Sequence, residues 1–191
     1  MKSNREPVQD LLSRYRERIY RRYEYPHVGE RSFMKAIIAF DTVYGNTKMV
    51  ANEVAVVLKE LGHEAELIDL KSWDRQTPMG DILFIGSPTR MVRMTRPAKR
   101  FAMKLDRDEW EGKPVYAFDT IMVPADQAQQ AKAAKWTANG AAPKLKELLA
   151  GRGLMVQDKM LRVPVIGLKG PLADSWRSQI RAFVVEAVGK K

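Results

Sequence analysis

The stretch FDTVYGNTKMVANEV, residues 40–54, joins two patterns that belong to different secondary structures. Phe40 ends the apolar run KAIIAF, residues 35–40, which has the length and composition of a buried strand. From Met49 onward, apolar residues recur at the spacing of an amphipathic helix, which ends at Gly62. Residues 41–47 therefore form a loop, rich in hydroxyl groups, that passes directly from a strand into a helix.

This alternation of strand and helix continues to the end of the chain. Further strands are expected at residues 65–70, 81–86, 114–119 and 154–163, and further helices at 96–105, 141–151 and 173–188. The strands are apolar on both faces, which indicates a mostly parallel sheet covered by helices on both sides. The sequence thus predicts one α/β domain, residues 34–191, with a doubly wound five-stranded parallel sheet.

Ligands of such sheets bind beyond the carboxyl ends of the strands, where the strand order reverses. The loops expected there are residues 41–47, 86–96 and 119–140. In the first loop, the hydroxyls of Thr42 and Thr47, the Asn46 amide, Gly45 and the free N–H groups of a helix start form a receptor for a terminal phosphate. Neither GK[ST] nor GxGxxG is present, so this is no P-loop or dinucleotide fingerprint. The alternative is an ordinary capped turn.

Two motifs at these positions resemble those of the flavodoxins. TVYGNT, residues 42–47, resembles their phosphate-binding [ST]-x-T-G-x-T loop, and GSPT, residues 86–89, resembles their second flavin loop. The resemblance extends over roughly residues 34–188 and implies a three-layer αβα fold with strand order 2-1-3-4-5. It also implies non-covalent FMN, with the isoalloxazine between loops that begin at Ser87 and Asp119. The implied cofactor-binding residues are Thr42, Val43, Tyr44, Gly45, Asn46, Thr47, Ser87, Pro88, Thr89, Arg90, Met91, Val92, Asp119, Thr120 and Trp136.

The chain departs from the flavodoxin pattern in its ring contacts. Tyr44 stands where flavodoxins often carry a threonine, and the loop after Ser87 has no aromatic residue to stack on the ring. Met91, Val92 and Met94 are expected to supply apolar contact instead. KWTANGAAPKL, residues 135–145, resembles a GW-S-G-G-A segment of related flavoproteins. Trp136 therefore either flanks the flavin or packs as a lid on its own domain.

The composition excludes several kinds of chemistry. The absence of cysteine excludes disulfides, thiolate nucleophiles and thiolate metal sites, and redox chemistry would therefore need an organic cofactor. His27 and His63 are expected to be separate, solvated surface residues, so no metal site is predicted. No apolar run reaches the length of about 18 residues that spans a membrane, and no signal-peptide pattern begins the chain. We expect a cytoplasmic protein without a membrane span.

The net charge of +10 predicts attraction to anionic partners. No RNP-type motif, zinc finger or lysine-rich tail accompanies it, so nucleic acid is not an expected partner. Basic residues follow the second loop at Arg90, Arg93, Arg96, Lys99 and Arg100. They are suited to docking an acidic redox protein or to holding the 2′-phosphate of NADPH. A solvated basic face is the alternative.

Residues 1–33 form a separate extension. Apolar residues recur at helical spacing between Val8 and Tyr23, five arginines lie largely on other faces, and Pro26 ends the pattern. This indicates a basic amphipathic helix that packs on the domain or on a second subunit, giving a homodimer. A helix lying on a membrane surface is the alternative.

The function that follows from the resemblance is electron transfer between redox partners through bound FMN. An FMN-dependent NAD(P)H:quinone or related reductase is the first alternative, since it would only need a second ligand over the ring. A flavin-free interaction module with the same fold is the second. The sequence identifies no catalytic residue, and it does not separate a carrier from an enzyme.

Overall fold

A computed structural model describes residues 33–123 and 138–189. Five parallel strands form one sheet in the order β2-β1-β3-β4-β5, which confirms the predicted fold. The strands are β1 (Lys35–Phe40), β2 (Glu64–Asp69), β3 (Ile82–Pro88), β4 (Val115–Val123) and β5 (Leu161–Ile166). The helices are α2 (Asn46–Glu60), α3 (Arg96–Lys104), α5 (Ala141–Ala150) and α6 (Trp176–Gly189).

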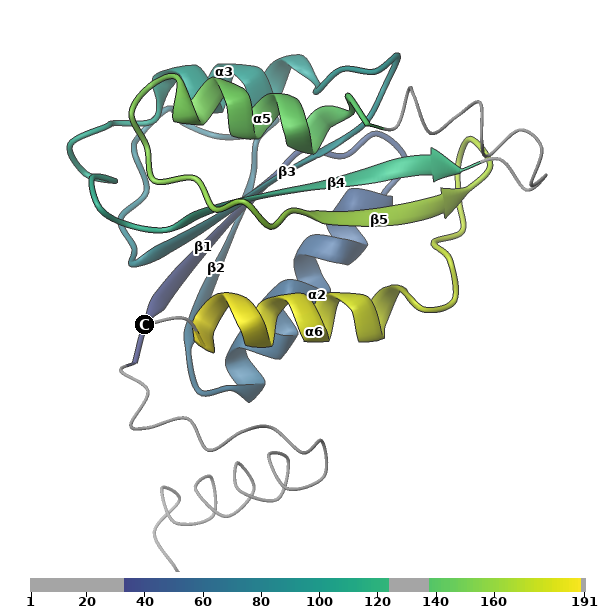
Figure 1. The fold of residues 1–191 in the computed structure, drawn as a ribbon, viewed down its shortest axis with the longest axis horizontal. Coiled ribbons are helices and arrows are strands. Elements are labelled where there is room, and N and C mark those ends of the chain that lie inside the picture. Colours follow the sequence, from purple (N-terminus) through teal and green to yellow (C-terminus); the bar gives the residue numbers. More distant parts are fainter. Residues whose placement is uncertain (1–32, 124–137, 190–191) are drawn as a thin grey trace, which may run out of the picture.

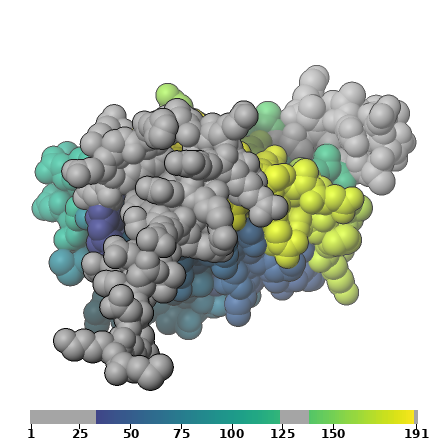
Figure 2. Space-filling model, turned by 90° about the horizontal axis from the view of Figure 1, so that it is seen from below, coloured from purple at the N-terminus to yellow at the C-terminus, as the bar shows by residue number. Residues whose placement is uncertain are grey.

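Helices cover both faces of the sheet, so the domain has three layers. Figure 1 shows α3 and α5 on one face and α2 and α6 on the other. The neighbouring helices α2 and α6 are also seen from below in Figure 2, in blue and yellow. Successive side chains of β1 point to opposite faces: Ile38 and Phe40 pack toward α2 and α6, and Ile37 and Ala39 toward α3 and α5. A strand buried on both faces needs this continuous apolar run.

The chain visits β2 on one side of β1 and then β3 on the other, so the strand order reverses at the carboxyl ends of β1 and β3. All five strands are parallel, and their carboxyl ends therefore meet at one edge of the sheet. The loop after β1, the loop after β3 and the end of β4 lie at this edge. This is the place where doubly wound sheets bind ligands.

Two strands differ from their predicted bounds. β4 continues to Val123, which places Asp119 and Thr120 inside a strand and not in the loop after it. β5 covers Leu161–Ile166 and includes Pro164, whereas residues 154–163 were expected. β5 lies at the edge of the sheet, where a proline is tolerated because one side of the strand needs no ladder hydrogen bonds. Of the earlier residues, Val156 forms only an isolated bridge with Val115.

His63 is buried, with 4% of its surface exposed, so the prediction of a solvated histidine was wrong. The turn after α2 folds back on the helix, and the His63 N–H donates to the Leu58 carbonyl at 3.0 Å. The sequence pattern alone did not indicate this burial. The predicted helix in residues 1–33, His27 and Trp136 lie outside the described residues. Within the described ranges, no helix is long and apolar enough to cross a membrane.

Candidate cofactor site

The loop after β1 opens onto free space in front of a helix start. Gly45 has φ of 91°, a left-handed conformation that favours glycine, and its N–H donates to Thr42 Oγ1 at 3.0 Å. α2 begins at the next residue, and no side chain of the described residues caps it. A Cβ atom placed on Gly45 would meet nothing within 4 Å. We call this open space at Gly45 the cradle; the first N–H groups of α2, which begins beside it, lack intrahelical partners.

Two threonine hydroxyls connect this helix start to the middle of the sheet. Thr47 in α2 and Thr120 in β4 are 1% and 4% exposed, and their Oγ1 atoms lie 2.8 Å apart. The Thr120 carbonyl accepts the N–H of Thr89, at the end of β3, at 2.9 Å. The loop after β1 and the loop after β3 are therefore both anchored on one residue of β4.

The loop after β3 is a tight turn with strained backbone at its tip. Arg90 and Arg93 exchange two backbone hydrogen bonds of 2.9 Å. Met91 and Val92 between them have φ of 47° and 61°, values that residues other than glycine adopt infrequently and that are least suited to the β-branched Val92. Lys144 Nζ donates to the Val92 carbonyl at 2.6 Å and fixes the turn to α5. Met91 is 92% exposed at the tip.

The base of this turn is held by a buried ion pair. Asp119 is fully buried, and its Oδ1 and Oδ2 accept hydrogen bonds from Arg162 Nε at 3.1 Å and Nη2 at 2.9 Å. The Oδ2 atom also accepts the Thr89 hydroxyl at 2.8 Å and the Ala142 N–H at 3.1 Å. Asp119 was implied to bind the cofactor. In the structure its side chain joins β4, β5, the loop after β3 and the start of α5.

A single glycine makes the close approach of α5 to this ion pair possible. A Cβ atom on Gly140 would lie 2.4 Å from Arg162 Nη2, 2.6 Å from Thr89 Oγ1 and 2.8 Å from Asp119 Oδ2. No side chain fits at such distances. The resemblance to flavoproteins indicated a segment of small residues here, and this network explains why one of them lacks a side chain.

The structure brings the predicted site residues of the three loops together, except Trp136, which lies outside the described residues. Val43 and Tyr44 are exposed on the first loop, and the Arg90 guanidinium lies 5.9 Å from the centre of the Tyr44 ring. Ser87 is buried at the end of β3, where its Oγ accepts the Thr95 N–H at 3.0 Å. The exposed surface of the site therefore comes from the first loop and from the turn at Arg90–Arg93.

Sequence reasoning missed Lys71 and Asp41 at this site. Lys71 follows β2, and its ammonium group donates to the Thr42 carbonyl at the start of the first loop. The same Nζ lies 3.9 Å from Oδ1 of Asp41, the residue before Thr42. A signal was available, since the strand order implied by the resemblance places the ends of the first and second strands side by side. The loop after the second strand was nevertheless left out.

A second missed contact comes from the turn after β5. Asn46 Nδ2, at the first residue of α2, donates to the Lys169 carbonyl at 3.0 Å. A Cβ atom on Gly170 would lie 3.0 Å from Asn46 Oδ1, so the two segments are in direct contact. The Asn46 amide, predicted to serve the phosphate, is therefore engaged with the protein through its nitrogen.

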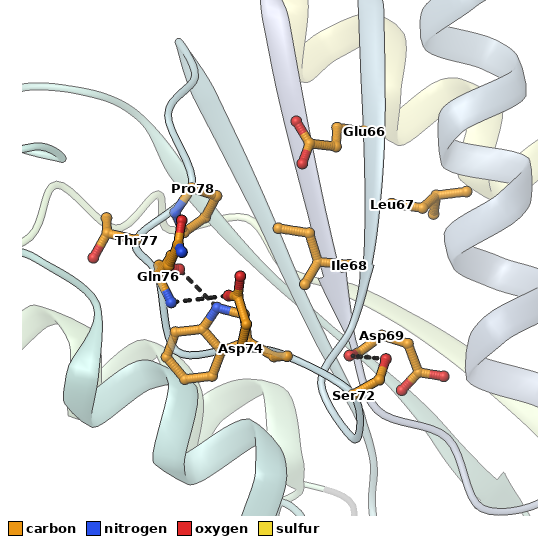
Figure 3. Close-up of a pocket in the computed structure, with 10 residues that line it drawn as sticks. Glu66, Leu67, Ile68, Asp69, Ser72, Asp74, Gln76, Thr77 and Pro78 are labelled. Carbon is orange, nitrogen blue, oxygen red and sulfur yellow. Dashed lines mark hydrogen bonds between the residues drawn. The ribbon is translucent and has the colours of Figure 1, made fainter.

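A groove of about 390 Å³ lies elsewhere, along the edge strand β2. Figure 3 shows Glu66 and Ile68 of β2 on one side of it, with Gln76 and Pro78 of the following loop across from them, while Leu67 points away. None of the predicted cofactor-binding residues lines this groove. Within the described residues, no group of three or more histidine or acidic side chains is arranged to hold a metal ion.

Comparisons with known proteins agree with this arrangement. No curated protein matches the sequence significantly. A family model described as a flavodoxin domain matches residues 37–160, which include the first loop, the turn after β3 and Asp119. The chain belongs to the flavodoxin domain family.

Solved structures show the same fold at low sequence identity. A flavodoxin from the domain Archaea is 19% identical, with a TM-score of 0.63, and the match covers 81% of this chain and 96% of that one. Oxidised flavodoxin 1 from Bacillus cereus is 22% identical, with a TM-score of 0.59, and the match covers 81% of this chain and 97% of that one. The flavodiiron protein from Giardia intestinalis is 18% identical, with a TM-score of 0.60, and the match covers 81% of this chain but 35% of that protein.

Proposed function

We propose that this protein binds FMN at the carboxyl edge of its sheet and transfers electrons to or from a protein partner. The observation that carries the proposal is the open cradle at Gly45, which precedes an uncapped helix start in a chain of the flavodoxin domain family. Unpaired backbone N–H groups and the positive end of the helix dipole favour a phosphate at such a place.

The residues present fit the cofactor. The backbone N–H groups at the start of α2 and the Thr42 hydroxyl would hold the phosphate, and Tyr44 and the turn at Arg90–Arg93 would border the ring. FMN, when bound, supplies a ring that accepts and donates electrons singly or in pairs. The chain's own part is to bind the phosphate, to orient the ring and to leave one edge accessible, which the exposed Met91 permits.

The partner that we propose is an acidic protein. Arg90, Arg93, Arg96, Lys99 and Arg100 are all exposed, and among the described residues none of them forms an ion pair. No acidic residue occurs between Asp81 and Asp106, so this stretch of the chain carries a net positive charge. It includes the turn that would border the ring, and charge complementarity there would speed the encounter with an acidic partner.

Two measurements test this function. When FMN is titrated with cofactor-free protein, its fluorescence should be quenched and the quenching should reach saturation. The absence of saturable quenching would overturn the proposal. Reduction of an acidic redox protein should then slow with rising salt. Reversing Lys99 and Arg100 to Glu, on α3 and outside the implied FMN contacts, should slow it at low salt without changing FMN affinity, whereas Lys59→Glu, at the far end of α2, should not slow it. Rapid NAD(P)H oxidation with a quinone and no protein partner would favour the reductase instead.

A further inference from the structure

Lys71 brings a positive charge to the proposed phosphate loop, although it is not one of the residues assigned to the FMN site above. The lysine lies two residues beyond β2, and its backbone N–H is fixed by Asp69 Oδ1 at 3.0 Å. Its ammonium group reaches across to the neighbouring strand end and donates to the carbonyl of Thr42. Thr42 is thereby held at both ends, because its hydroxyl accepts the Gly45 N–H.

A buried carboxylate helps to keep the ammonium group there. Asp41 is 2% exposed, and its Oδ1 has no hydrogen-bond partner among the described residues. Burying a carboxylate without a partner is unfavourable, and Lys71 Nζ, at 3.9 Å, is the cation that compensates it. The attraction of Asp41 therefore helps to hold the charged end of Lys71 beside the loop.

The ammonium group retains the capacity to bind an anion. It has three donors, of which the Thr42 carbonyl takes one. Asp41 Oδ1 lies beyond hydrogen-bond distance, and the Lys71 side chain is 52% exposed. At least one donor of the ammonium group therefore remains available beside Thr42.

We propose that Lys71 supplies a positive charge to the cofactor phosphate and so makes the site prefer FMN over riboflavin. The inference rests on the proposed function and names what determines the specificity of that site. The helix start and the loop hydroxyls carry only partial charges, whereas Lys71 carries a full one next to them. A phosphate dianion gains from this charge, and the uncharged end of riboflavin does not.

Three variants separate charge from positioning. Lys71→Gln removes the charge but keeps an amide that can donate to Thr42. Lys71→Arg keeps the charge, and Lys71→Met removes both charge and donor. Lys104→Gln, exposed at the end of α3, removes the same charge at a distance and is the control. The dissociation constants of FMN and riboflavin are measured for each by fluorescence titration of the cofactor-free protein, in low and high salt.

Lys71→Gln should weaken FMN binding about fivefold at low salt, the upper end for a partly exposed ion pair, and change riboflavin binding less than about 1.5-fold. Salt should reduce the difference between wild type and variant. Lys71→Arg should bind FMN like the wild type, as should Lys104→Gln. If riboflavin binds too weakly to titrate, inorganic phosphate is used as a competitor of FMN. The inhibition constant of phosphate against FMN binding should be about fivefold higher for Lys71→Gln than for the wild type.

Equal losses for FMN and riboflavin, or FMN binding unchanged in Lys71→Gln, would overturn the role of Lys71. The second result would do so while leaving the proposed function intact. Failure of the wild-type protein to bind FMN would instead overturn the proposed function itself. The two failures are therefore distinguishable in one set of titrations.

Discussion

The hydroxyl oxygens of Thr47 and Thr120 lie 2.8 Å apart, although the two residues are 73 positions apart in the sequence. Thr47 belongs to the first turn of α2 and Thr120 to β4, so this hydrogen bond fixes the proposed phosphate loop on the centre of the sheet. Both hydroxyls are buried, and each serves as the polar partner of the other. Thr47 consequently has a structural role besides the one that the resemblance to flavodoxins implied.

Substituting either threonine should therefore have different effects on stability and on binding. Thr47→Ala removes a hydroxyl that the resemblance to flavodoxins assigns to the phosphate, and it leaves Thr120 without its partner. We expect FMN binding to weaken roughly tenfold to a hundredfold, and unfolding to become easier by about 1 to 3 kcal/mol. Thr120→Val should lower stability by a similar amount but weaken FMN less. Urea unfolding and FMN titration of both variants test this, and equal binding losses would argue against a direct phosphate contact of Thr47.

The ion pair of Asp119 and Arg162 is expected to contribute to stability because Asp119 has no exposed surface. Of the partners that the carboxylate has among the described residues, Arg162→Met would leave the Thr89 hydroxyl and the Ala142 N–H. A buried charge without its counter-ion is strongly destabilising, and we expect a loss of about 2 to 3 kcal/mol. Adding Asp119→Asn should recover part of it. No recovery in the double variant would indicate that the arginine acts through packing alone.

These contacts show which parts of the site are visible in the sequence. The phosphate loop is a local pattern, since one glycine, two threonines and a helix start within a few residues fix its geometry. The pairing of Asp119 with Arg162 depends on the register of β4 and β5, in which the two residues lie opposite each other. Lys71 likewise reaches Thr42 only because β2 lies beside β1. Neither relationship is encoded in spacing along the chain, and residue type alone did not indicate them.

The turn at Met91 and Val92 should become more stable when Val92 is replaced by Gly. Val92 has φ of 61°, which costs a non-glycine residue about 1 to 3 kcal/mol, and a β-branched side chain is among the least suited to it. Glycine relieves this cost but adds freedom to the unfolded chain, so we expect a net gain of about 1 kcal/mol. Thermal unfolding measures it, with Val92→Ala as the control. A loss of stability would show that the side chain contributes packing that outweighs the strain.

Deletion of residues 1–32, which lie outside the described residues, tests the predicted N-terminal helix. If this segment packs on the domain or on a second subunit, its apolar face is buried, at roughly 1.5 to 3 kcal/mol for each large side chain. The truncated protein should then melt at a lower temperature or elute as a smaller species from a sizing column. Unchanged melting and size would indicate that the segment makes no such contact.

The stability of the domain should fall at high pH because of Tyr116. This residue is 2% exposed on β4, and its hydroxyl donates to the Ala187 carbonyl at 3.3 Å. Burial raises the pKa of Tyr116 above its ordinary value of 10.0, because the phenolate would lose its solvation. In the unfolded chain the group ionises near pH 10, whereas in the folded protein it keeps its proton. The unfolded state is therefore favoured progressively as the pH rises above about 10.

Tyr116→Phe removes this contribution, so the stability difference between variant and wild type should shift in favour of the variant between pH 9 and 11, roughly one unit either side of that pKa. Urea unfolding of both proteins across this range measures the difference, and a difference independent of pH would show that Tyr116 ionises equally well in the two states.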